Sequence, residues 1–302
     1  MNILLTGSGG QLGWELSRVL APLGELAAFD RARLDLADAA GIRSALREIK
    51  PGIIVNAAAY TAVDRAQSEP EAAFAINTRA PGILGDEARR LSALLIHYST
   101  DYVFDGTRPQ PYTEDDLPNP INVYGASKLE GERAIAASGA RYWIFRTSWV
   151  YAPRGKNFLL TMLRLAREGK PLRVVADQFG APTSAAMLAR ATAQALSMRP
   201  REQNEEEHPA AAPPSGIYHM SAAGRTSWHG FACAILREFG YADPVAPLAT
   251  LEFPTPARRP ANSVLDNGRL AACFGIRMPV WETGLRETAA GLKDPEGPRI
   301  AR

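Results

Sequence analysis

The sequence predicts an α/β fold in which helices cover both faces of a parallel sheet. In the first 150 residues, short apolar runs typical of buried strands alternate with segments whose apolar residues recur at helical spacing. A glycine-rich turn joins the first apolar run to the first helical segment. The chain has 302 residues, of which 46% are hydrophobic and 22% charged, so it can bury a large core. Alternating strands and helices predict a doubly wound parallel sheet.

Five strands and four helical segments are expected in this part of the chain. The expected strands are 2–6, 26–30, 52–59, 93–99 and 142–148. The first expected helix begins after residue 10, and the second covers 42–49 and ends before Pro51. The third covers 69–91 with an interruption near Pro81 and Gly82, and the fourth covers 123–137.

The alternation loosens after about residue 150, where prolines become frequent. Helical patterns are expected at 157–168, 183–197, 226–239 and 281–291. Short strands are expected at 172–176 and 216–220, and one or both of them could return to the main sheet. Residues 199–215 are charged and then rich in Ala and Pro, which predicts a mobile surface insertion.

Composition argues against nucleic-acid and membrane partners in general and leaves a local basic patch open. The net charge of +2 gives no general attraction to nucleic acid or membranes, and no apolar run approaches the roughly 18 residues of a membrane span. Cys233 and Cys273 form no C-x-x-C pair and are expected to be buried thiols in a reducing compartment. No signal peptide is visible at the N-terminus. These features predict a cytoplasmic protein.

The glycine-rich turn predicts a dinucleotide site. Gly7, Gly10 and Gly13 fit the pattern G-x-x-G-x-x-G between a strand and a helix. Glycines let the backbone approach a pyrophosphate closely, and the helix N-terminus offers free N–H groups. An acidic residue is expected at the end of the second strand to bind ribose hydroxyls, and Asp30 stands there.

Residues after Asp30 carry mixed signals on cofactor choice. The carboxylate favours NAD, whereas the adjacent Arg31 and Arg33 could pair with the 2′-phosphate of NADP. Asp35 and Leu36 follow where a loop could cover the adenine; a helix-capping turn is an equal alternative.

A polar sequence ends the fourth strand, and a Tyr/Lys pair follows it. Ser99, Thr100 and Asp101 lie at the carboxyl end of this strand, where ligands of doubly wound sheets bind. Tyr124 and Lys128 are four residues apart and share one face of a helix. An ammonium near Tyr124 would lower the phenol pKa, so that Tyr124 could give a proton to a carbonyl oxygen as hydride arrives at carbon. The Thr100 hydroxyl could bind the same oxygen.

These motifs and longer stretches resemble the dTDP-4-dehydrorhamnose reductases of the extended short-chain dehydrogenase/reductase superfamily. The matching stretches span nearly the whole chain: MNILLTGSGGQLGWEL, VNAAAYTAVDRAQSEPE, HYSTDYVFDG, NVYGASKLEGE, FRTSWVY, DQFGAPT and TPARRPANSVLD. The resemblance implies a Rossmann-type NAD(P)-binding domain over 1–148 and a smaller, mainly substrate-binding domain over 149–302. It also implies reduction of the 4-keto group of dTDP-4-dehydro-L-rhamnose to dTDP-L-rhamnose, with NADPH or NADH.

The resemblance assigns site residues in three groups. The implied catalytic residues are Thr100, which orients the carbonyl, Tyr124, the proton donor, and Lys128, which lowers the pKa of Tyr124. The implied substrate contacts are Thr100, Asp101, Trp149, Asn157, Gln178 and Arg259. The cofactor contacts are Gly7, Gly10, Gln11, Leu12, Asp30, Asp35, Leu36, Ala59, Tyr60, Thr61, Tyr124 and Lys128, together with Arg31 from the charge pattern. Trp149 could instead be a core aromatic residue, and Arg259 could form a surface or interface salt bridge.

One departure from the family concerns magnesium. Some members hold Mg²⁺ between two subunits through glutamates; Glu15 and Glu282 match two of these positions, but Ala186 stands where a third carboxylate is expected. A weakened magnesium site or none is therefore expected, and a homodimer formed by that route is left open. Two alternative functions remain: a nucleotide-sugar epimerase or dehydratase on the same scaffold, and a non-catalytic regulatory subunit.

Overall fold

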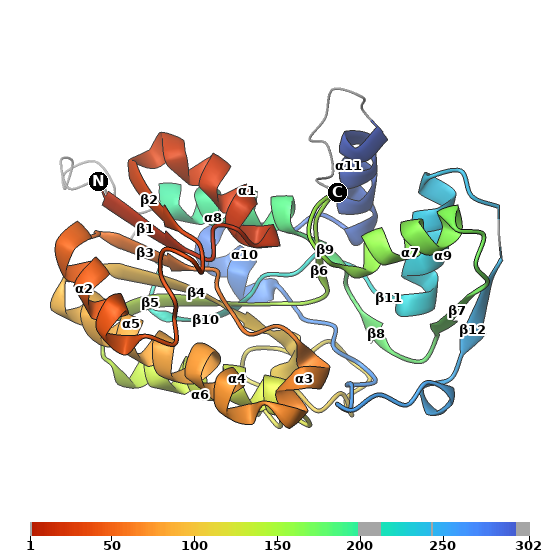
Figure 1. Ribbon diagram of the computed structural model, residues 1–302, viewed down its shortest axis with the longest axis horizontal. Helices are drawn as coiled ribbons and strands as arrows, with labels where there is room; N and C mark the ends of the chain where they lie inside the picture. The colour runs from red at the N-terminus through yellow and green to blue at the C-terminus, as the bar shows by residue number, and fades with distance from the viewer. Residues whose placement is uncertain (1, 199–212, 243, 294–302) are drawn as a thin grey trace.

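A six-stranded parallel sheet forms the centre of the computed structural model, which describes residues 2–198, 213–242 and 244–293 (Figure 1). The strand order across the sheet is β10-β5-β4-β3-β1-β2. The bounds are Asn2–Thr6 for β1, Glu25–Phe29 for β2, Ile53–Asn56 for β3, Leu94–Thr100 for β4, Arg141–Thr147 for β5 and Gly216–His219 for β10. From β1 the chain runs to β2 at one edge of the sheet and then crosses back to β3 on the other side of β1. The strand order therefore changes direction between the adjacent strands β1 and β3, and a crevice is expected at their carboxyl ends.

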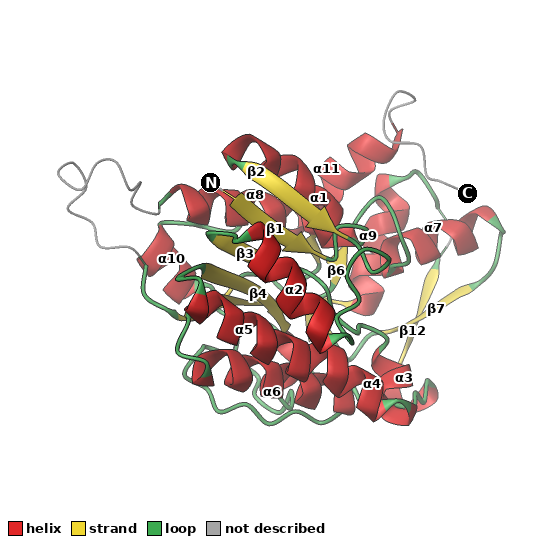
Figure 2. Ribbon diagram, turned by 60° about the vertical axis from the view of Figure 1, so that its left-hand side comes forward, coloured by secondary structure: helices red, strands yellow, loops and turns green. Residues whose placement is uncertain are grey.

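Successive residues of each strand face the two sides of the sheet. On β1, Ile3 and Leu5 belong to one hydrophobic core, and Leu4, between them, belongs to the other. The first core lies against α1 (Gln11–Leu20) and α8 (Ala185–Ser197). The second lies against α2 (Ala39–Ile49), α5 (Ala80–Arg90) and α6 (Val123–Ala137). Figures 1 and 2 show these two helical layers on opposite faces, which is the doubly wound arrangement that the sequence predicts.

The helical region predicted at 69–91 is divided before Pro81. It consists of α4 (Pro70–Phe74), a π-turn at Ala75–Arg79 and α5, preceded by α3 (Val63–Ser68). Pro81 has no N–H to donate to the Asn77 carbonyl four residues earlier, which accounts for the widened turn. A side chain at Gly131 of α6 would meet this Asn77 carbonyl oxygen at 2.0 Å, so α6 packs closely against the turn.

The later half of the chain contributes to two parts of the molecule. β10, α8 and α10 (Gly268–Phe274) pack with the main sheet. By contrast β7 (Leu172–Val175) pairs with β12 (Val245–Leu248) in a separate parallel ribbon near α7 (Phe158–Arg167) and α9 (Trp228–Glu238) (Figure 1). One of the two strands predicted after residue 150 therefore returns to the main sheet. The division of the chain at residue 148 stays a prediction.

Short elements complete the fold. They are β6 (Val150–Tyr151) with β9 (Thr183–Ser184), β8 (Phe179–Gly180) with β11 (Thr226–Ser227), and α11 (Trp281–Lys293). β12 and α10 were not predicted, because a proline-rich strand and a seven-residue helix carry little periodic signal. The predicted mobile insertion lies mostly outside the described residues. Cys233 is exposed and Cys273 is partly exposed, so the prediction of two buried thiols is wrong.

Candidate active site

A cavity of about 930 Å³ opens at the carboxyl ends of β1, β3 and β4. It is lined by the glycine turn, by the segments that follow β2 and β3, by the end of β4, and by one face of α6. Most of the predicted site residues line it; the exceptions are Gly13, Arg33, Gln178 and Arg259. Its volume is within the range of small-molecule and cofactor sites.

The glycine turn leaves the N-terminus of α1 open to this cavity. Gly7 has a positive φ of 74°, and a side chain there would meet the Ala58 backbone nitrogen at 2.7 Å. Gly10 is the N-cap of α1 and supplies no side-chain cap, so the first N–H groups of the helix remain available. This uncapped end beside a bare backbone fits an anionic pyrophosphate.

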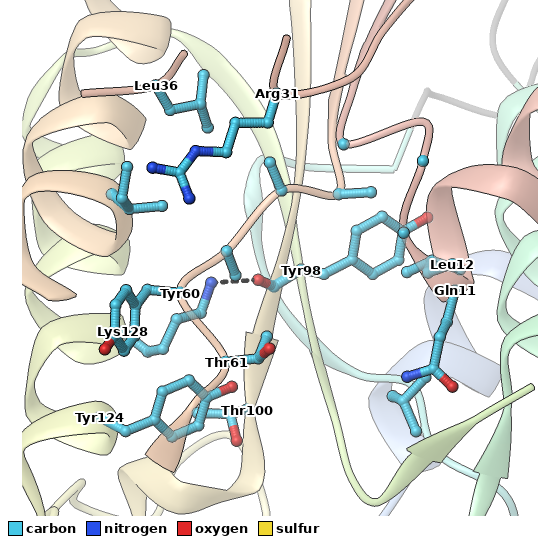
Figure 3. Close-up of a pocket in the computed structure, with 18 of the residues that line it drawn as sticks. Gln11, Leu12, Arg31, Leu36, Tyr60, Thr61, Tyr98, Thr100, Tyr124 and Lys128 are labelled. Atoms are coloured by element: carbon cyan, nitrogen blue, oxygen red, sulfur yellow. Dashed lines mark hydrogen bonds between the residues drawn. The ribbon is translucent and has the colours of Figure 1, made fainter. Parts of the chain in front are cut away.

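At the end of β2, only one of the two predicted arginines reaches the cavity. Arg31 lines it and extends beside Leu36 (Figure 3). Arg33 turns away: its guanidinium donates to the Ala28 carbonyl at 3.2 Å and lies 4.5 Å from the centre of the Phe29 ring. Arg33 therefore does not line the cavity in this structure, and binding of the 2′-phosphate by Arg33 stays untested. Asp30 lines the cavity, and its Oδ1 accepts the Arg33 backbone N–H at 3.0 Å.

The next segment, Asp35–Ala37, forms a local turn. Asp35 Oδ1 accepts the Ala37 N–H at 2.9 Å, while Asp38, not Asp35, caps α2. Asp35 and Leu36 both line the cavity, so the alternative that Asp35 only caps a helix is wrong.

The segment after β3 is fixed by a buried asparagine. β3 ends at Asn56, three residues earlier than predicted, so Ala59, Tyr60 and Thr61 form a loop along the cavity. Asn77 accepts the Tyr60 backbone N–H at 2.8 Å and donates to its carbonyl at 3.0 Å. Asn77 is 0% exposed and was missed in the sequence, since a lone Asn in a helical pattern carries no signal for this contact.

At the end of β4, Thr100 and Asp101 are buried beside the cavity. The Thr100 hydroxyl donates to Asp101 Oδ1 at 2.9 Å and accepts the Tyr102 N–H at 3.1 Å. Burial raises the pKa of Asp101 to about 7, although the hydroxyls of Ser263 and Thr100 lower it. A carboxyl group with this pKa changes charge near neutral pH.

Tyr124 and Lys128 both line the cavity from α6, as their spacing predicts. Burial raises the pKa of Tyr124 to about 12, while hydrogen bonding to Thr100 lowers it. Lys128 Nζ instead donates to the Tyr98 carbonyl at 2.6 Å (Figure 3). It also lies 3.0 Å from His97 Nε2. Lys128 is not among the groups that shift the pKa of Tyr124 here, so its proposed role of lowering that pKa stays a prediction. Burial lowers the pKa of Lys128 itself to about 8.

Trp149 forms one wall of the cavity rather than part of the core. Its indole stacks on Trp228 of α9, with ring centroids 3.6 Å apart and planes at 6°. A side chain at Gly180 would meet the indole at 2.5 Å, so Gly180 makes room for it. Trp149 also has a positive φ of 48°, a strained conformation that clusters at functional sites.

The three remaining predicted substrate residues are used in other contacts. Asn157 lines the cavity, caps α7 and donates to Gln11 Oε1 at 2.8 Å, which links the later half of the chain to the glycine turn. Gln178 donates to the Thr250 hydroxyl at 3.1 Å. Arg259 forms a two-pronged ion pair with Asp64 at 2.6 and 2.8 Å, so the salt-bridge alternative for Arg259 describes its contact here. Substrate roles for these residues stay predictions.

Several of the residues that line the cavity were not predicted from the sequence. They include Tyr98, whose carbonyl holds Lys128, and Arg65, Glu69 and Lys156. Glu69 accepts from the Tyr60 hydroxyl at 2.5 Å and pairs with Arg65 at 2.9 Å. A charged pair on a short helix is usually a solvated surface feature, and only the fold brings this one to the cavity.

The part of the chain that the structure describes shows neither a metal-ligand cluster nor a membrane-spanning helix. No group of three or more His, Cys, Asp or Glu side chains within it converges as metal ligands. No helix within it is long and apolar enough to cross a bilayer.

Comparison with known proteins gives a consistent family. Residues 1–293 match the family model described as RmlD substrate binding domain. A dTDP-4-dehydrorhamnose reductase of Burkholderia thailandensis is 50% identical over 289 residues, which are 93% of this chain and 95% of that protein.

Two solved structures are similar in fold and sequence. A dTDP-4-dehydrorhamnose reductase of Clostridium acetobutylicum matches 97% of this chain and all of that chain, with a TM-score of 0.89 and 37% identity. The enzyme of the same name from Bacillus anthracis, solved in complex with NADP, matches 95% of this chain and 98% of that chain, with a TM-score of 0.87 and 36% identity. Since the family model and this identity extend over almost the full length, the chain belongs to the dTDP-4-dehydrorhamnose reductases, an oxidoreductase family with a Rossmann-type fold.

Proposed function

We propose that this protein reduces the 4-keto group of dTDP-4-dehydro-L-rhamnose to give dTDP-L-rhamnose, with NADPH as the preferred cofactor and NADH also used. The observation that carries the proposal is the convergence of Thr100 and Tyr124 on the cavity that the glycine turn also lines. A proton donor and a dinucleotide-type turn facing one cavity are what carbonyl reduction by a nicotinamide requires.

The cofactor would lie along the carboxyl edge of the sheet. Its pyrophosphate would meet the N-terminus of α1 at Gly10, Gln11 and Leu12, with Gly7 beneath it. Its adenosine end would meet Asp30, Arg31, Asp35 and Leu36, and the nicotinamide half would pass the loop at Ala59, Tyr60 and Thr61 and lie near Lys128. The bound nicotinamide would supply the hydride that adds to C4 of the sugar.

Tyr124 would complete the reduction by proton transfer. As the C4 carbonyl carbon gains hydride, its oxygen gains electron density, and the Tyr124 hydroxyl gives its proton to that oxygen to form the alcohol. The phenolate left on Tyr124 then regains a proton from water. Because burial holds the pKa of Tyr124 near 12, the phenol is protonated at neutral pH and able to act as the acid. Thr100 would orient the carbonyl by a hydrogen bond.

The nucleotide-sugar would occupy the part of the cavity between Thr100 and the indole of Trp149. Trp149 offers a flat, rigid surface for a base or sugar, and Asp101 offers an acceptor for a sugar hydroxyl. Asn157, Gln178 and Arg259 complete the proposed set of substrate residues.

Location, assembly and metal binding belong to the same proposal. A cytoplasmic location fits free thiols in a reducing compartment. A homodimer remains a prediction, as does a weak magnesium site or none.

The experiment that tests the proposal is an NADPH-oxidation assay across nucleotide-linked 4-keto sugars, with the product identified by mass spectrometry. We expect the highest kcat/KM with dTDP-4-dehydro-L-rhamnose and a product two hydrogen masses heavier than the substrate. Sugar turnover without net NADPH oxidation would instead indicate an epimerase or dehydratase. Binding of NADPH without any turnover would indicate the regulatory subunit.

A further inference from the structure

A chain of buried polar side chains runs from Lys128 across the main sheet. Lys128 Nζ lies 3.0 Å from His97 Nε2 on β4, and His97 Nδ1 lies 3.0 Å from Asn56 Nδ2 on β3. Asn56 Oδ1 accepts from the Thr6 hydroxyl on β1 at 2.6 Å. All four side chains are at most 1% exposed, and only Lys128 lines the cavity.

The donors and acceptors of this chain determine where the His97 proton lies. Asn56 Oδ1 also accepts the Ala58 backbone N–H at 3.3 Å. Because a backbone N–H can only donate, this contact requires the oxygen of the Asn56 amide, and not its nitrogen, to face Ala58. Asn56 Nδ2 therefore donates to His97 Nδ1. A neutral imidazole carries one proton, and with Nδ1 accepting, that proton sits on Nε2 and faces Lys128.

An Nε2–H group can donate to Lys128 only if the amine has a lone pair. The uncharged amine has one, and it can still donate to the Tyr98 carbonyl at 2.6 Å. The ammonium has none, so its presence would require His97 to move its proton to Nδ1 and Asn56 to turn its amide away from Ala58. The charge on Lys128 is thus coupled to the tautomer of His97.

We infer that His97, oriented by Asn56, is a positioning residue for Lys128: through Nε2–H it fixes where the amino group lies and favours its uncharged form. His97 does not line the cavity, so it acts through Lys128. The inference deepens the proposed function, on which only its consequence for turnover depends.

The charges around Lys128 agree with this reading. Glu132, one turn along α6, favours the ammonium, but both of its oxygens already bind Arg146 at 2.9 and 2.6 Å. Other titratable side chains line the same cavity as Lys128, among them Tyr60, Tyr98, Asp101 and Tyr124. Burial lowers the pKa of Lys128 to about 8 and, together with the Lys128 charge, lowers that of His97 well below its usual value, so His97 is the neutral partner.

The consequence for turnover follows from charge. A Lys128 ammonium would favour the phenolate that Tyr124 becomes after giving up its proton. The hydrogen bonds through His97 would then set the pH above which Lys128 loses its charge and no longer stabilises the Tyr124 phenolate. If His97 only packed against Lys128, its replacement would leave that pH unchanged.

The test is a titration of the lysine Cε signals by ¹³C NMR, in the cofactor-free protein. The chain has five lysines, and the Lys128 signal is identified by its loss in Lys128→Met. We expect a midpoint near 8 in the wild type. In His97→Gln it should rise by roughly one pH unit or more, because the glutamine carbonyl can accept from an ammonium. His229→Gln, the same exchange on α9, is the matched control and should leave the midpoint unchanged.

A second measurement needs no variant. Long-range ¹H–¹⁵N spectra of the four histidines report the tautomer of each ring. At about pH 9, where Lys128 has mostly lost its charge, His97 should carry its proton on Nε2. A proton on Nδ1 at this pH, or an unshifted Lys128 midpoint in folded His97→Gln, would overturn the inference. Both readouts are independent of turnover, so a failure of the proposed reaction is detected separately, by the NADPH assay.

Discussion

The guanidinium of Arg259 binds both carboxylate oxygens of Asp64, at 2.6 and 2.8 Å, and so ties the segment before β-bridge residue Asn262 to α3. The neighbouring Arg258 carbonyl accepts from Asn122, the N-cap of α6, at 2.9 Å. One short segment is thus fastened to two helices that flank the cavity, and α6 carries Tyr124.

We expect the Arg259–Asp64 pair to contribute to both substrate binding and stability. Asp64→Asn and Arg259→Met should each raise the KM for the nucleotide-sugar and change kcat little, because the segment would loosen without any loss of the proton donor. A double-mutant cycle on the free energy of unfolding should give a coupling of about 0.5–1 kcal/mol for this partly exposed pair. Arg258→Met, whose exposed side chain makes neither contact, is the control.

The same pair makes stability depend on pH. Hydrogen bonding to Arg259 lowers the pKa of Asp64, so the stabilisation is present above the unfolded-state pKa and is lost as pH falls through the lower folded-state pKa. Asp64→Asn should therefore lose its stability difference from wild type in acid. A difference that persists there, or additive single effects, would contradict the ion-pair role.

Tyr124→Phe tests the proton donor. The variant keeps the ring, including its edge contact with Tyr102 at 5.9 Å between centroids, and removes only the hydroxyl. We expect kcat to fall by roughly 10²- to 10⁴-fold, the usual size of general acid catalysis, with an unchanged Kd for NADPH. Stopped-flow hydride transfer and fluorescence titration measure the two quantities. Activity within about twofold of wild type would remove Tyr124 from the proposed role.

Which parts of the site could be predicted depends on how far apart in the sequence the contacting residues lie. Gly7 and Gly10 lie beside one strand end, and Tyr124 and Lys128 lie one helical turn apart, so local patterns suffice to bring each set together. Local spacing also correctly predicts that Tyr124 and Lys128 share a face. It does not predict where the Lys128 amino group points, because His97 and the Tyr98 carbonyl come from β4, about thirty residues away.

The sequence did not predict polar contacts between residues that lie far apart in the chain. Arg259 and Asp64 are 195 residues apart, and Asn157 and Gln11 are 146 apart. No periodic pattern links such positions. Arg33 shows a different limit. Its charge suggested phosphate binding, but in the structure its guanidinium binds the Ala28 carbonyl and lies over the Phe29 ring instead of lining the cavity.

Arg31 and Arg33 form a matched pair for cofactor choice. Arg31 lines the cavity, whereas Arg33 is turned onto Phe29. Arg31→Ala should raise the KM for NADPH by roughly tenfold through loss of a charge-assisted contact with the 2′-phosphate, and should leave that for NADH nearly unchanged. Arg33→Ala should change neither. Equal effects of Arg31→Ala on both cofactors would mean that Arg31 does not read the phosphate.

Asp101 links substrate recognition to a cost in stability. The carboxyl group is 2% exposed, and burial raises its pKa to about 7. Because the folded-state pKa lies above the unfolded value of about 3.9, the folded protein binds the extra proton more tightly, and stability falls as pH rises between these two values. Above the higher value the full penalty of a buried carboxylate is present.

Asp101→Asn removes that penalty and keeps an oxygen to accept from Thr100. We expect the variant to be more stable than wild type at pH 8, by on the order of 2 kcal/mol, and the gain to vanish near pH 4, where both proteins are uncharged at this position. The same variant should raise the KM for the nucleotide-sugar and leave the Kd for NADPH unchanged, since a carboxylate accepts more strongly than an amide from a sugar hydroxyl. Thermal unfolding at the two pH values and steady-state kinetics measure these effects. A variant less stable than wild type at pH 8 would show that Asp101 is ionised at little cost, and an unchanged KM would remove it from the substrate site.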